Sequence, residues 1–391
     1  MRELIAKYDR KLRAAGLAGA PLVCGLDDEL YWNREDPAAA TLRGVLEGMD
    51  INSLIYAEPA EPYRTLLRSL VLRHPDTITP GDCETRTFLH DLPVVHVFEE
   101  EAILARLRKR KSVIIDADDT VRVVTFGTVS PEQAFVTFSS VCFSTFVLFF
   151  TSYLEDLRAG RAANGQHRAF DHALPLVSAP VPPLPELRRG PFTDEEEVLA
   201  AMIEAGRATV ARGLVDSYFG NISCRLGETI YISQTASSLD ELAGCIDPCP
   251  LDGSSCAGIT ASSELSAHTE IYLRTDRLAI LHGHPKFSVI LSMDCDLQDC
   301  PQRGQCHIKC SRERFIHDIP IVPGEVGTGP TGLCATLPPA IADRRGAIVW
   351  GHGLFTTGKV DFTDALRSMV EIEEMCRREY LERIRELRHT S

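Results

Sequence analysis

Two short apolar runs in the second half of the chain each lead into histidine flanked by glycine. Residues 278–281 run directly into the sequence HGHP at 282–285, and residues 347–350 run into GHG at 351–353. A continuous apolar run of this length, bounded by turn residues, is typical of a buried strand. The pattern therefore predicts two buried strands that deliver histidines at their ends.

Amphipathic helical patterns surround these runs. They predict helices from 193 to about 212, from 263 to about 275, near 335–344 and from 363 onward, with a short strand around 230–233. Strands that alternate with helices in this way are typical of an α/β domain whose helices pack against a sheet.

The most apolar stretch of the chain is FVTFSSVCFSTFVLFF at 135–150. It has sixteen residues, fewer than the roughly 20 that a membrane-spanning helix needs. Serine and threonine also interrupt it throughout. We therefore expect a buried or interface helix here and no membrane span.

The chain reads as two copies of one pattern. FLHDLPVV at 88–95 matches FIHDIPIV at 315–322, and SVIIDADDTV at 112–121 matches GAIVWGHGLF at 346–355. GTVSPEQAF and GKVDFTDAL follow these blocks in the same order. Three matched blocks in one order indicate an internal duplication.

The two copies differ where the histidines stand. Opposite HGHP the first copy has AEPAEP at 57–62, and opposite His352 it has Asp118. The simpler interpretation is a first copy that kept its fold and lost its site. The alternative is that its carboxylates bind a harder ion.

A proline-rich run separates the copies and divides the chain. ALPLVSAPVPPLPELRRGP begins at Ala173, and such a run cannot continue a helix. We expect a degenerate domain at 1–172, a linker at 173–192 and a second domain at 193–391. Thr193 and Glu196 suit a capping box that opens the next helix.

Composition narrows the functional classes. The 391 residues suit two domains, and the net charge of -14 argues against nucleic acid as a partner. The densest basic cluster, RLRKRK at 106–111, is interpreted as a solvated helix end. The first seventeen residues predict a charged amphipathic helix and no signal peptide. Without such a signal, thirteen cysteines predict a reducing, cytoplasmic location.

The histidines have the spacing of a metal site. Residues two apart on a strand point to the same side, so His282 and His284 could hold one ion. His352, from a second strand end, would complete three protein ligands and leave room for water or substrate, as in catalytic zinc sites. The alternative is three core histidines beside glycines.

The second half of the chain resembles the class II aldolase/adducin head family, which includes fuculose-phosphate aldolase. The resemblance covers about 195–385 and is carried by GNIS (220–223), SQTAS (233–237), SSE (262–264), HGHP (282–285) and GHGLF (351–355). It implies a three-layer αβα domain with a central, mainly antiparallel sheet. The internal repeat then implies two such domains in tandem, the first degenerate.

The resemblance also implies roles for individual residues. The three histidines would hold Zn²⁺ or another divalent metal, with Glu264 at the open coordination face as the catalytic residue. The family's phosphate pocket maps onto Asn221, Thr235, Ser237, Ser262 and Ser263. The chain departs from the family where a glycine is expected near Ala236, which leaves recognition of phosphate open.

Glu264 distinguishes between the reactions known in the family. Aldolases resemble this chain in having glutamate after the serine pair, whereas the sugar-phosphate epimerase has aspartate. The resemblance thus implies a lyase that cleaves or forms a C–C bond of a small sugar or sugar phosphate through a metal-stabilised enediolate. An epimerase, a dehydratase, a decarboxylase or a non-catalytic adducin-like binding module are the alternatives.

Family aldolases complete the site with a group from a neighbouring subunit, so the resemblance implies a homo-oligomer. The completing residue cannot be assigned here, although Tyr218, Tyr272 and Tyr380 are available. The first copy could pack on the second as one subunit packs on another. His268, His90 and His317 are expected to be structural.

Seven cysteines lie in two short segments that the family does not explain. Their spacing is not that of familiar zinc ribbons. The first interpretation is a structural zinc or an iron–sulfur cluster held by Cys295, Cys300, Cys306 and Cys310, or by a mixture of both segments; the alternatives are ordinary thiols or disulfides. The residues are Cys245, Cys249 and Cys256, and Cys295, Cys300, Cys306 and Cys310.

Overall fold

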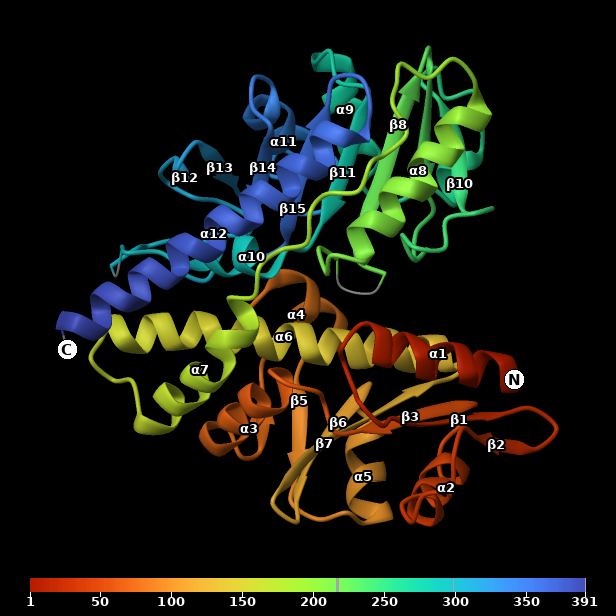
Figure 1. The fold of residues 1–391 in the computed structure, drawn as a ribbon, viewed down its shortest axis with the longest axis vertical. Coiled ribbons are helices and arrows are strands. Elements are labelled where there is room, and N and C mark those ends of the chain that lie inside the picture. Colours follow the sequence, from red (N-terminus) through yellow and green to blue (C-terminus); the bar gives the residue numbers. More distant parts are fainter. Residues whose placement is uncertain (216–217, 298, 391) are drawn as a thin grey trace. The chain divides into compact units, whose positions relative to one another are not determined.

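The chain folds as two units, Met1–Pro180 and Val181–Ser391, each built on its own sheet. The computed structural model in Figure 1 describes residues 1–215, 218–297 and 299–390. The boundary lies inside the predicted linker. Helix α7 (Asn164–Val177) nevertheless extends past the expected linker start. Ala173 is buried in the core of the first unit, which keeps the helix intact.

The first unit has a seven-stranded sheet in the order β2-β1-β3-β7-β6-β5-β4. Only β5 and β6 pair in parallel among its neighbouring strands. Helices α2 and α5 cover one face, and α1, α3 and α6 lie on the other. The remaining elements are α1 (Arg2–Ala14), β1 (Leu22–Leu26), β2 (Leu30–Trp32), α2 (Ala39–Glu47), β3 (Ser53–Ala57), α3 (Tyr63–Arg73), β4 (Thr77–Ile78), α4 (Cys83–Leu89), β5 (Leu92–Val95), α5 (Glu100–Leu107), β6 (Ser112–Ala117), β7 (Thr120–Gly127) and α6 (Pro131–Arg158).

The second unit has an eight-stranded sheet in the order β10-β9-β8-β11-β15-β14-β13-β12. Helices α9 and α11 cover one face, and α8, α10 and α12 cover the other. Its elements are α8 (Glu195–Val210), β8 (Asn221–Leu226), β9 (Thr229–Ser233), β10 (Ile246–Pro250), α9 (Leu265–Arg274), β11 (Ala279–Gly283), α10 (Lys286–Met293), β12 (Arg314–Ile316), β13 (Ile319–Val322), α11 (Leu333–Ile341), β14 (Gly346–Val349), β15 (Gly353–Gly358) and α12 (Phe362–Thr390).

The two sheets have one topology, so the tandem arrangement expected from the sequence is confirmed. Seven strands correspond one to one in order, and β10 is an addition at one edge. The single parallel pair recurs as β13 with β14. His90 and His317, which the repeat matches, both adopt positive φ, 64° and 52°. A left-handed backbone at one repeat position in both copies is a shared local structure that histidine rarely adopts.

Strand register refines how the copies correspond around the histidines. Tyr56 and His282 are each the fourth residue of a central strand, and each pairs with the first residue of the neighbouring strand, Leu22 or Asn221. Tyr56, and not residues 57–62, therefore stands opposite the first histidine. The sequence match placed this block one residue late.

The helix that precedes this strand in each copy corresponds as well. Ala38 caps α2 and Glu264 caps α9. The two caps have similar local bonds: Asp36 Oδ1 accepts from the Ala38 N–H at 2.9 Å, and Ser262 Oγ accepts from the Glu264 N–H at 3.3 Å. The first copy therefore keeps the turn and lacks the carboxylate.

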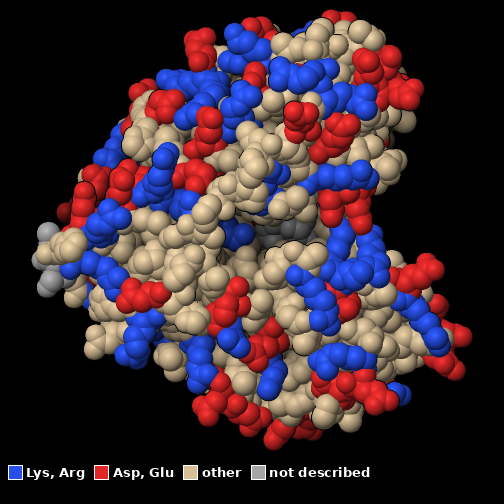
Figure 2. Space-filling view, in the orientation of Figure 1, with Lys and Arg blue, Asp and Glu red and all other residues tan. Residues whose placement is uncertain are grey.

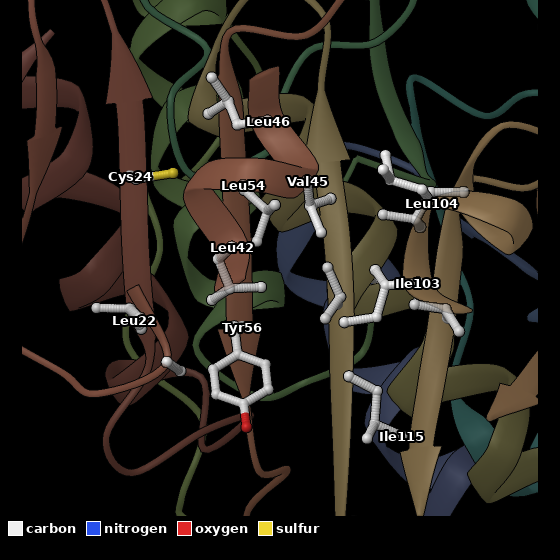
Figure 3. Packing of buried hydrophobic residues seen from close by; sticks show 14 of the residues in the cluster. Leu22, Cys24, Leu42, Val45, Leu46, Leu54, Tyr56, Ile103, Leu104 and Ile115 are labelled. Carbon is white, nitrogen blue, oxygen red and sulfur yellow. The ribbon is translucent and has the colours of Figure 1, made fainter. Parts of the chain in front are cut away.

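An apolar cluster fills the corresponding region of the first copy. Figure 3 shows Tyr56 beside Leu42 and Leu22, among aliphatic side chains from the sheet, α2 and α5. Leu22 and Leu42 are fully buried, and Tyr56 is 8% exposed. The fold is thus stable with leucine, alanine and tyrosine where the second copy has asparagine, glutamate and histidine.

Helix α6 is a core helix of the first unit, as expected for the apolar stretch. It is long and apolar enough to span a membrane, but 83% of its most apolar window is buried inside the protein. One side packs on β3 and β7, and α1, α3 and α4 pack around the rest. Contact on nearly all sides explains why it is apolar around its whole circumference.

The cap of α8 differs by one residue from the prediction. Asp194 is the N-cap, and its carboxylate accepts from the Glu197 N–H at 2.9 Å. Thr193 instead donates its own N–H and hydroxyl to Glu197 Oε2. The sequence offers two cap formers in a row, each followed three residues later by glutamate, so spacing alone could not choose between them.

Surface charge is mixed on the face that Figure 2 shows. Lys and Arg side chains alternate with Asp and Glu side chains there. That face has no continuous basic stripe of the kind that neutralises a phosphate backbone.

Replacement of Asp82 with asparagine is expected to change how the first unit's stability depends on pH. Asp82 is fully buried at the N-cap of α4, and burial raises its pKa from 3.8 to about 6, although bonds from Thr85 oppose the shift. The folded state thus holds this proton more tightly than the unfolded state, and the stabilisation is lost as pH rises from about 4 to 6. Asparagine keeps the cap without the charge. The free energy of unfolding of the Asp82→Asn protein, relative to that of the wild type, should therefore increase by about 2 kcal/mol between pH 4 and 7.

Urea unfolding across this pH range measures the effect. The chain has two tryptophans, Trp32 and Trp350, so a Trp350→Phe background lets Trp32 report on the first unit alone. Asp119→Asn is the control because that side chain is fully exposed. A pH-independent difference between Asp82→Asn and wild type would contradict the prediction.

Candidate active site

Strand β11 and the turn between β14 and β15 deliver the three histidines. On β11, Ile280 packs in the core under α9 and α11, and the two-residue period places His282 on the same face at the strand end. His284 follows directly, where β11 gives way to α10. His352 lies in the turn after β14, where Gly351 takes φ 57°, a conformation that glycine adopts without strain.

The three imidazoles converge, as the spacing predicted. One ring nitrogen from each of His282, His284 and His352 lies within 4.8 Å of the other two. The Nε2 atoms of His282 and His284 are 3.1 Å apart. All three side chains are buried. Among the residues that the structure describes, this is the one group of three or more histidines, cysteines or carboxylates whose ligand atoms meet in this way.

Two neighbours make this convergence sterically feasible. Phe355, opposite His282 across the β11–β15 pair, stacks on its ring with centroids 3.9 Å apart. Gly353 leaves the necessary space: a Cβ there would lie 2.7 Å from His282 Cε1 and 2.7 Å from His284 Cδ2. Any side chain at 353 would therefore push the rings apart, so a glycine is required next to His352.

Burial keeps the rings of His282 and His284 in the neutral form, which is the form that binds a metal. Burial, and then the neighbouring histidines, hold the pKa of His282 well below its usual range, and burial with His352 does the same for the pKa of His284. The neutral His282 ring can donate Nδ1–H to the Leu354 carbonyl at 3.2 Å. This bond leaves its Nε2 lone pair directed at the other imidazoles. A donor set of three imidazoles fits zinc or a similar divalent ion.

Glu264 faces the histidines from the start of α9. Its carboxylate oxygens lie 3.5 Å from His282 Nε2 and 3.3 Å from His352 Nε2, and the side chain is 5% exposed. Asn221 donates its amide to Glu264 Oε2 at 2.5 Å. This asparagine comes from the first residue of β8, a neighbour of β11 in the sheet. The structure thus joins GNIS, SSE, HGHP and GHG in one site.

The residues expected to bind phosphate are placed in two groups. Asn221 and Ser262 both bond to Glu264, the one to its carboxylate and the other to its N–H. Thr235 and Ser237 lie in the loop after β9, where their hydroxyls donate to the carbonyls of Ala261 and Gln234.

Two of the residues expected to bind phosphate are exposed. Ser263 is exposed beside Glu264, and Thr235 is exposed in the loop after β9. Ala236 takes φ 58°, the conformation that glycine favours. The predicted departure from the family therefore lies at a left-handed position of this loop.

Burial separates the tyrosines that the sequence left open. Tyr272 and Tyr380 are fully buried, whereas Tyr218 keeps partial exposure. The Tyr272 hydroxyl and His268 Nδ1 both lie 2.7 Å from Ser223 Oγ, and burial lowers the pKa of His268 to about 3. His268 is therefore a neutral core histidine, as expected.

Sequence reasoning missed a pair of contacts that hold α10 between the two histidine segments. Glu373 of α12 accepts from the N–H groups of Phe287 and Ser288 and from the Ser288 hydroxyl, each at 2.8 Å. Three residues separate His284 from Ser288. Toward the other end of α10, Ser292 Oγ accepts from the Gly351 N–H at 2.9 Å, next to His352. The i,i+4 serines of α10 were the available signal.

Replacement of Glu373 with glutamine is expected to weaken metal binding about tenfold, the lower end of the effect seen when residues behind metal ligands are removed. Glutamine has one acceptor oxygen where three donors converge, and its amide N–H groups would face them. The start of α10 should then shift, and His284 with it. Competition with a chromophoric chelator measures the affinity.

Glu371→Gln is the matched control. Glu371 lies on the same helix, and its exposed carboxylate accepts from Arg345 at 2.7 Å. A Glu373→Gln protein with lower thermal stability and unchanged metal affinity would assign Glu373 a purely structural role.

The cysteines are free thiols in this structure. Cys249 lies on β10, and the segment with Cys295, Cys300, Cys306 and Cys310 ends at β12. These strands are the opposite edges of the sheet. Seven strand spacings of about 4.8 Å place the edges roughly 34 Å apart. A site shared by both segments is therefore wrong, because the sheet separates them.

Comparison with known proteins finds relatives of the second unit. Residues 200–380 match the model of the Class II Aldolase and Adducin N-terminal domain. A methylthioribulose-1-phosphate dehydratase of Methylococcus capsulatus is 30% identical over 195 residues, covering 46% of this chain and 92% of the relative. A 3,4-dihydroxyphthalate decarboxylase of Arthrobacter keyseri is 30% identical over 166 residues, covering 39% and 66%.

An L-fuculose phosphate aldolase of Methanococcus maripaludis is 28% identical over 188 residues, covering 47% of this chain and 96% of the relative. Among solved structures, the l-fuculose-1-phosphate aldolase of Thermus thermophilus has 24% identity and a TM-score of 0.40, covering 49% of this chain and 97% of that one. The second half of this chain belongs to the class II aldolase and adducin family. Its similar relatives catalyse three different reactions.

Proposed function

We propose that the second unit is a divalent-metal-dependent lyase of the aldolase type, acting on a small hydroxy-carbonyl compound. The observation that carries the proposal is the position of Glu264. Its carboxylate lies 3.3–3.5 Å from two of three converging imidazoles and is held there by Asn221. A carboxylate in that place can act on a substrate that reaches the metal position.

His282, His284 and His352 would hold the ion. When bound, a divalent ion supplies positive charge that stabilises the negative charge developing on a substrate carbonyl oxygen. Glu264 would take a proton from, or return it to, the carbon beside that carbonyl when a bond to the carbon breaks. Asn221 would keep the free lone pairs of Glu264 directed at that carbon by holding Oε2.

Dehydration is the second candidate reaction. The Methylococcus capsulatus relative, a methylthioribulose-1-phosphate dehydratase, matches over nearly its whole length at 30% identity. Dehydration begins with loss of a proton from the carbon beside a carbonyl, so the same carboxylate would serve. The order of steps differs: a dehydratase would lose the proton and then break a C–O bond with release of water, whereas an aldolase would break the C–C bond and then return a proton to the carbon.

The substrate we propose is a sugar or sugar phosphate. The exposed loop residues Thr235 and Ala236 and the exposed Ser263 lie where the family resemblance puts phosphate. A free carboxylate group is an alternative anion, because the decarboxylase relative is named for an aromatic acid. Thirteen free cysteines support a cytoplasmic location, and a homo-oligomer remains the expected assembly.

A non-catalytic binding module is the alternative that the internal repeat argues against. The first copy illustrates the fold without the polar set: Leu22, Ala38 and Tyr56 replace Asn221, Glu264 and His282. Nothing in the sheet topology requires the polar set. Its presence in the second copy alone is explained by chemistry at that site.

A metal assay followed by a substrate panel tests the proposal. The purified chain should contain a divalent ion, and the panel should include fuculose 1-phosphate, methylthioribulose 1-phosphate and 3,4-dihydroxyphthalate. Release of dihydroxyacetone phosphate or a similar carbonyl fragment supports an aldolase, and loss of water supports a dehydratase. A chain that binds metal and turns over none of these or related hydroxy-carbonyl compounds would contradict a lyase.

A further inference from the structure

The segment between α10 and β12 is the least regular part of the second unit. It comprises the 20 residues 294–313, and its described residues form turns without a helix or strand. The first copy joins the corresponding elements, α3 and β4, with residues 74–76 alone. A loop of this length without secondary structure is uncommon in a compact domain and usually has a function.

Hydrophobic burial does not account for the order of this segment. Leu297 is 39% exposed and Ile308 is only half-buried. None of its described hydrophobic residues belongs to the buried core. A segment without a core needs another source of stability, such as a disulfide or a metal ion.

Cysteine is the residue type that this segment has in place of a core. The spacing is Cys-x4-Cys-x5-Cys-x3-Cys, and all four side chains are half-buried. All four therefore lie within one stretch of sixteen residues.

A basic side chain accompanies one of these sulfurs. Arg312 donates to Cys295 Sγ at 3.6 Å. Cationic donors around thiols favour thiolates, the form that binds metals. Such donors also offset the net negative charge of four thiolates on one divalent ion.

We propose that this segment binds a structural zinc ion through its four thiolates, those of Cys295, Cys300, Cys306 and Cys310. Four soft ligands close the coordination sphere, which is the composition of structural rather than catalytic zinc sites. Among the described residues the sulfurs do not yet meet at ligand distance. Zinc would have to draw the turns at 300–310 together.

The site would stabilise one wall of the active-site region. His307, between two of the cysteines, has its ring 6.2 Å from that of Trp350, which directly precedes Gly351 and His352. The backbone of Gly324 also donates to the His307 carbonyl at 2.9 Å. An ordered segment would therefore limit movement of the turn that delivers His352.

Metal counting on the full chain, purified from zinc-supplemented medium, tests the proposal without relying on activity. We expect two zinc ions per chain. Cys306→Ser/Cys310→Ser should retain one and His282→Ala should retain the other. Cys256→Ser, an exposed cysteine outside this segment, should retain both. With cobalt, the His282→Ala protein should show thiolate charge-transfer absorption and the double cysteine variant should not.

Alkylation mapping on the wild-type chain decides the matter if the double variant does not fold. The four cysteines should resist iodoacetamide with zinc bound and react after chelation, while Cys256 reacts in both states. Equal zinc content in the wild type and the double variant, or equal labelling before and after chelation, would overturn the site. Iron with acid-labile sulfide in place of zinc would overturn the assignment of the ion. Loss of the histidine-bound ion alone would count against the proposed function and leave this site intact.

Discussion

Replacing His282 with alanine is expected to remove one divalent ion per chain and to lower kcat/KM by at least about 10³-fold. The ion position needs three imidazoles. His282 supplies one of them, with its Nε2 3.1 Å from that of His284 and its ring centroid 5.1 Å from that of His352. A catalytic metal contributes several kcal/mol to the transition state, and about 4 kcal/mol corresponds to 10³-fold. Metal analysis and steady-state kinetics on the active substrate measure both effects.

His317→Asn is the matched control for this variant. His317 is an exposed histidine of the same unit in a left-handed turn, a backbone that asparagine also tolerates. It should retain metal and activity. Full activity of His282→Ala without bound metal would show that the histidines have no part in the reaction.

The fold could be predicted well because its signals are local and repeated. The apolar runs at 278–281 and 347–350 lie on β11 and β14, and the repeated blocks recur as β5 with β6 and β13 with β14. Burial on both faces gives such strands continuous apolar sequences. Boundaries were less accurate. Helix α7 extends into the predicted linker because buried Ala173 outweighs the nearby proline.

The candidate site was predictable only where a motif contains the residues. The histidines and Glu264 lie in short motifs, and the structure brings them together. The contact from Asn221 to Glu264 joins β8 to α9, and the contact from Glu373 to Ser288 joins α12 to α10. Such contacts depend on how elements pack across many residues, and no spacing rule connects their members. The sequence indicated Asn221 as a candidate for binding phosphate, and its contact with Glu264 could not be read from it.

The internal repeat adds information that a single domain would lack. Register pairs Tyr56 with His282 and Leu22 with Asn221, although the sequence match at this block was shifted. The comparison therefore separates what the fold requires from what the chemistry requires. Gly127 and Gly358 end corresponding strands in both copies, whereas the polar set occurs once.

Replacing Glu264 with glutamine is expected to leave the metal bound and to lower kcat by about 10²–10⁴-fold, the range for loss of a general acid–base group. Glutamine keeps the shape of the side chain and can still accept from Asn221, but it cannot carry a proton. Asn221→Leu, the residue that the first copy has at Leu22, should lower kcat about tenfold because it leaves Glu264 without its anchor. Metal content, kcat and the pH profile of kcat measure the two roles.

Glu270→Gln is the control on the same helix, since that carboxylate is bonded to Arg274 at 2.7 Å on the outer face of α9. It should retain kcat within about twofold, as expected for an exposed ion pair. The two site variants differ in what they should do to the pH profile. Glu264→Gln removes the titrating group, so its residual rate should lose the limb that the carboxylate causes. Asn221→Leu should retain that limb, because the carboxylate is still present. If Glu264→Gln keeps both rate and limb, another group moves the proton, and Tyr218, the one half-buried tyrosine of the three candidates, is the next residue to replace.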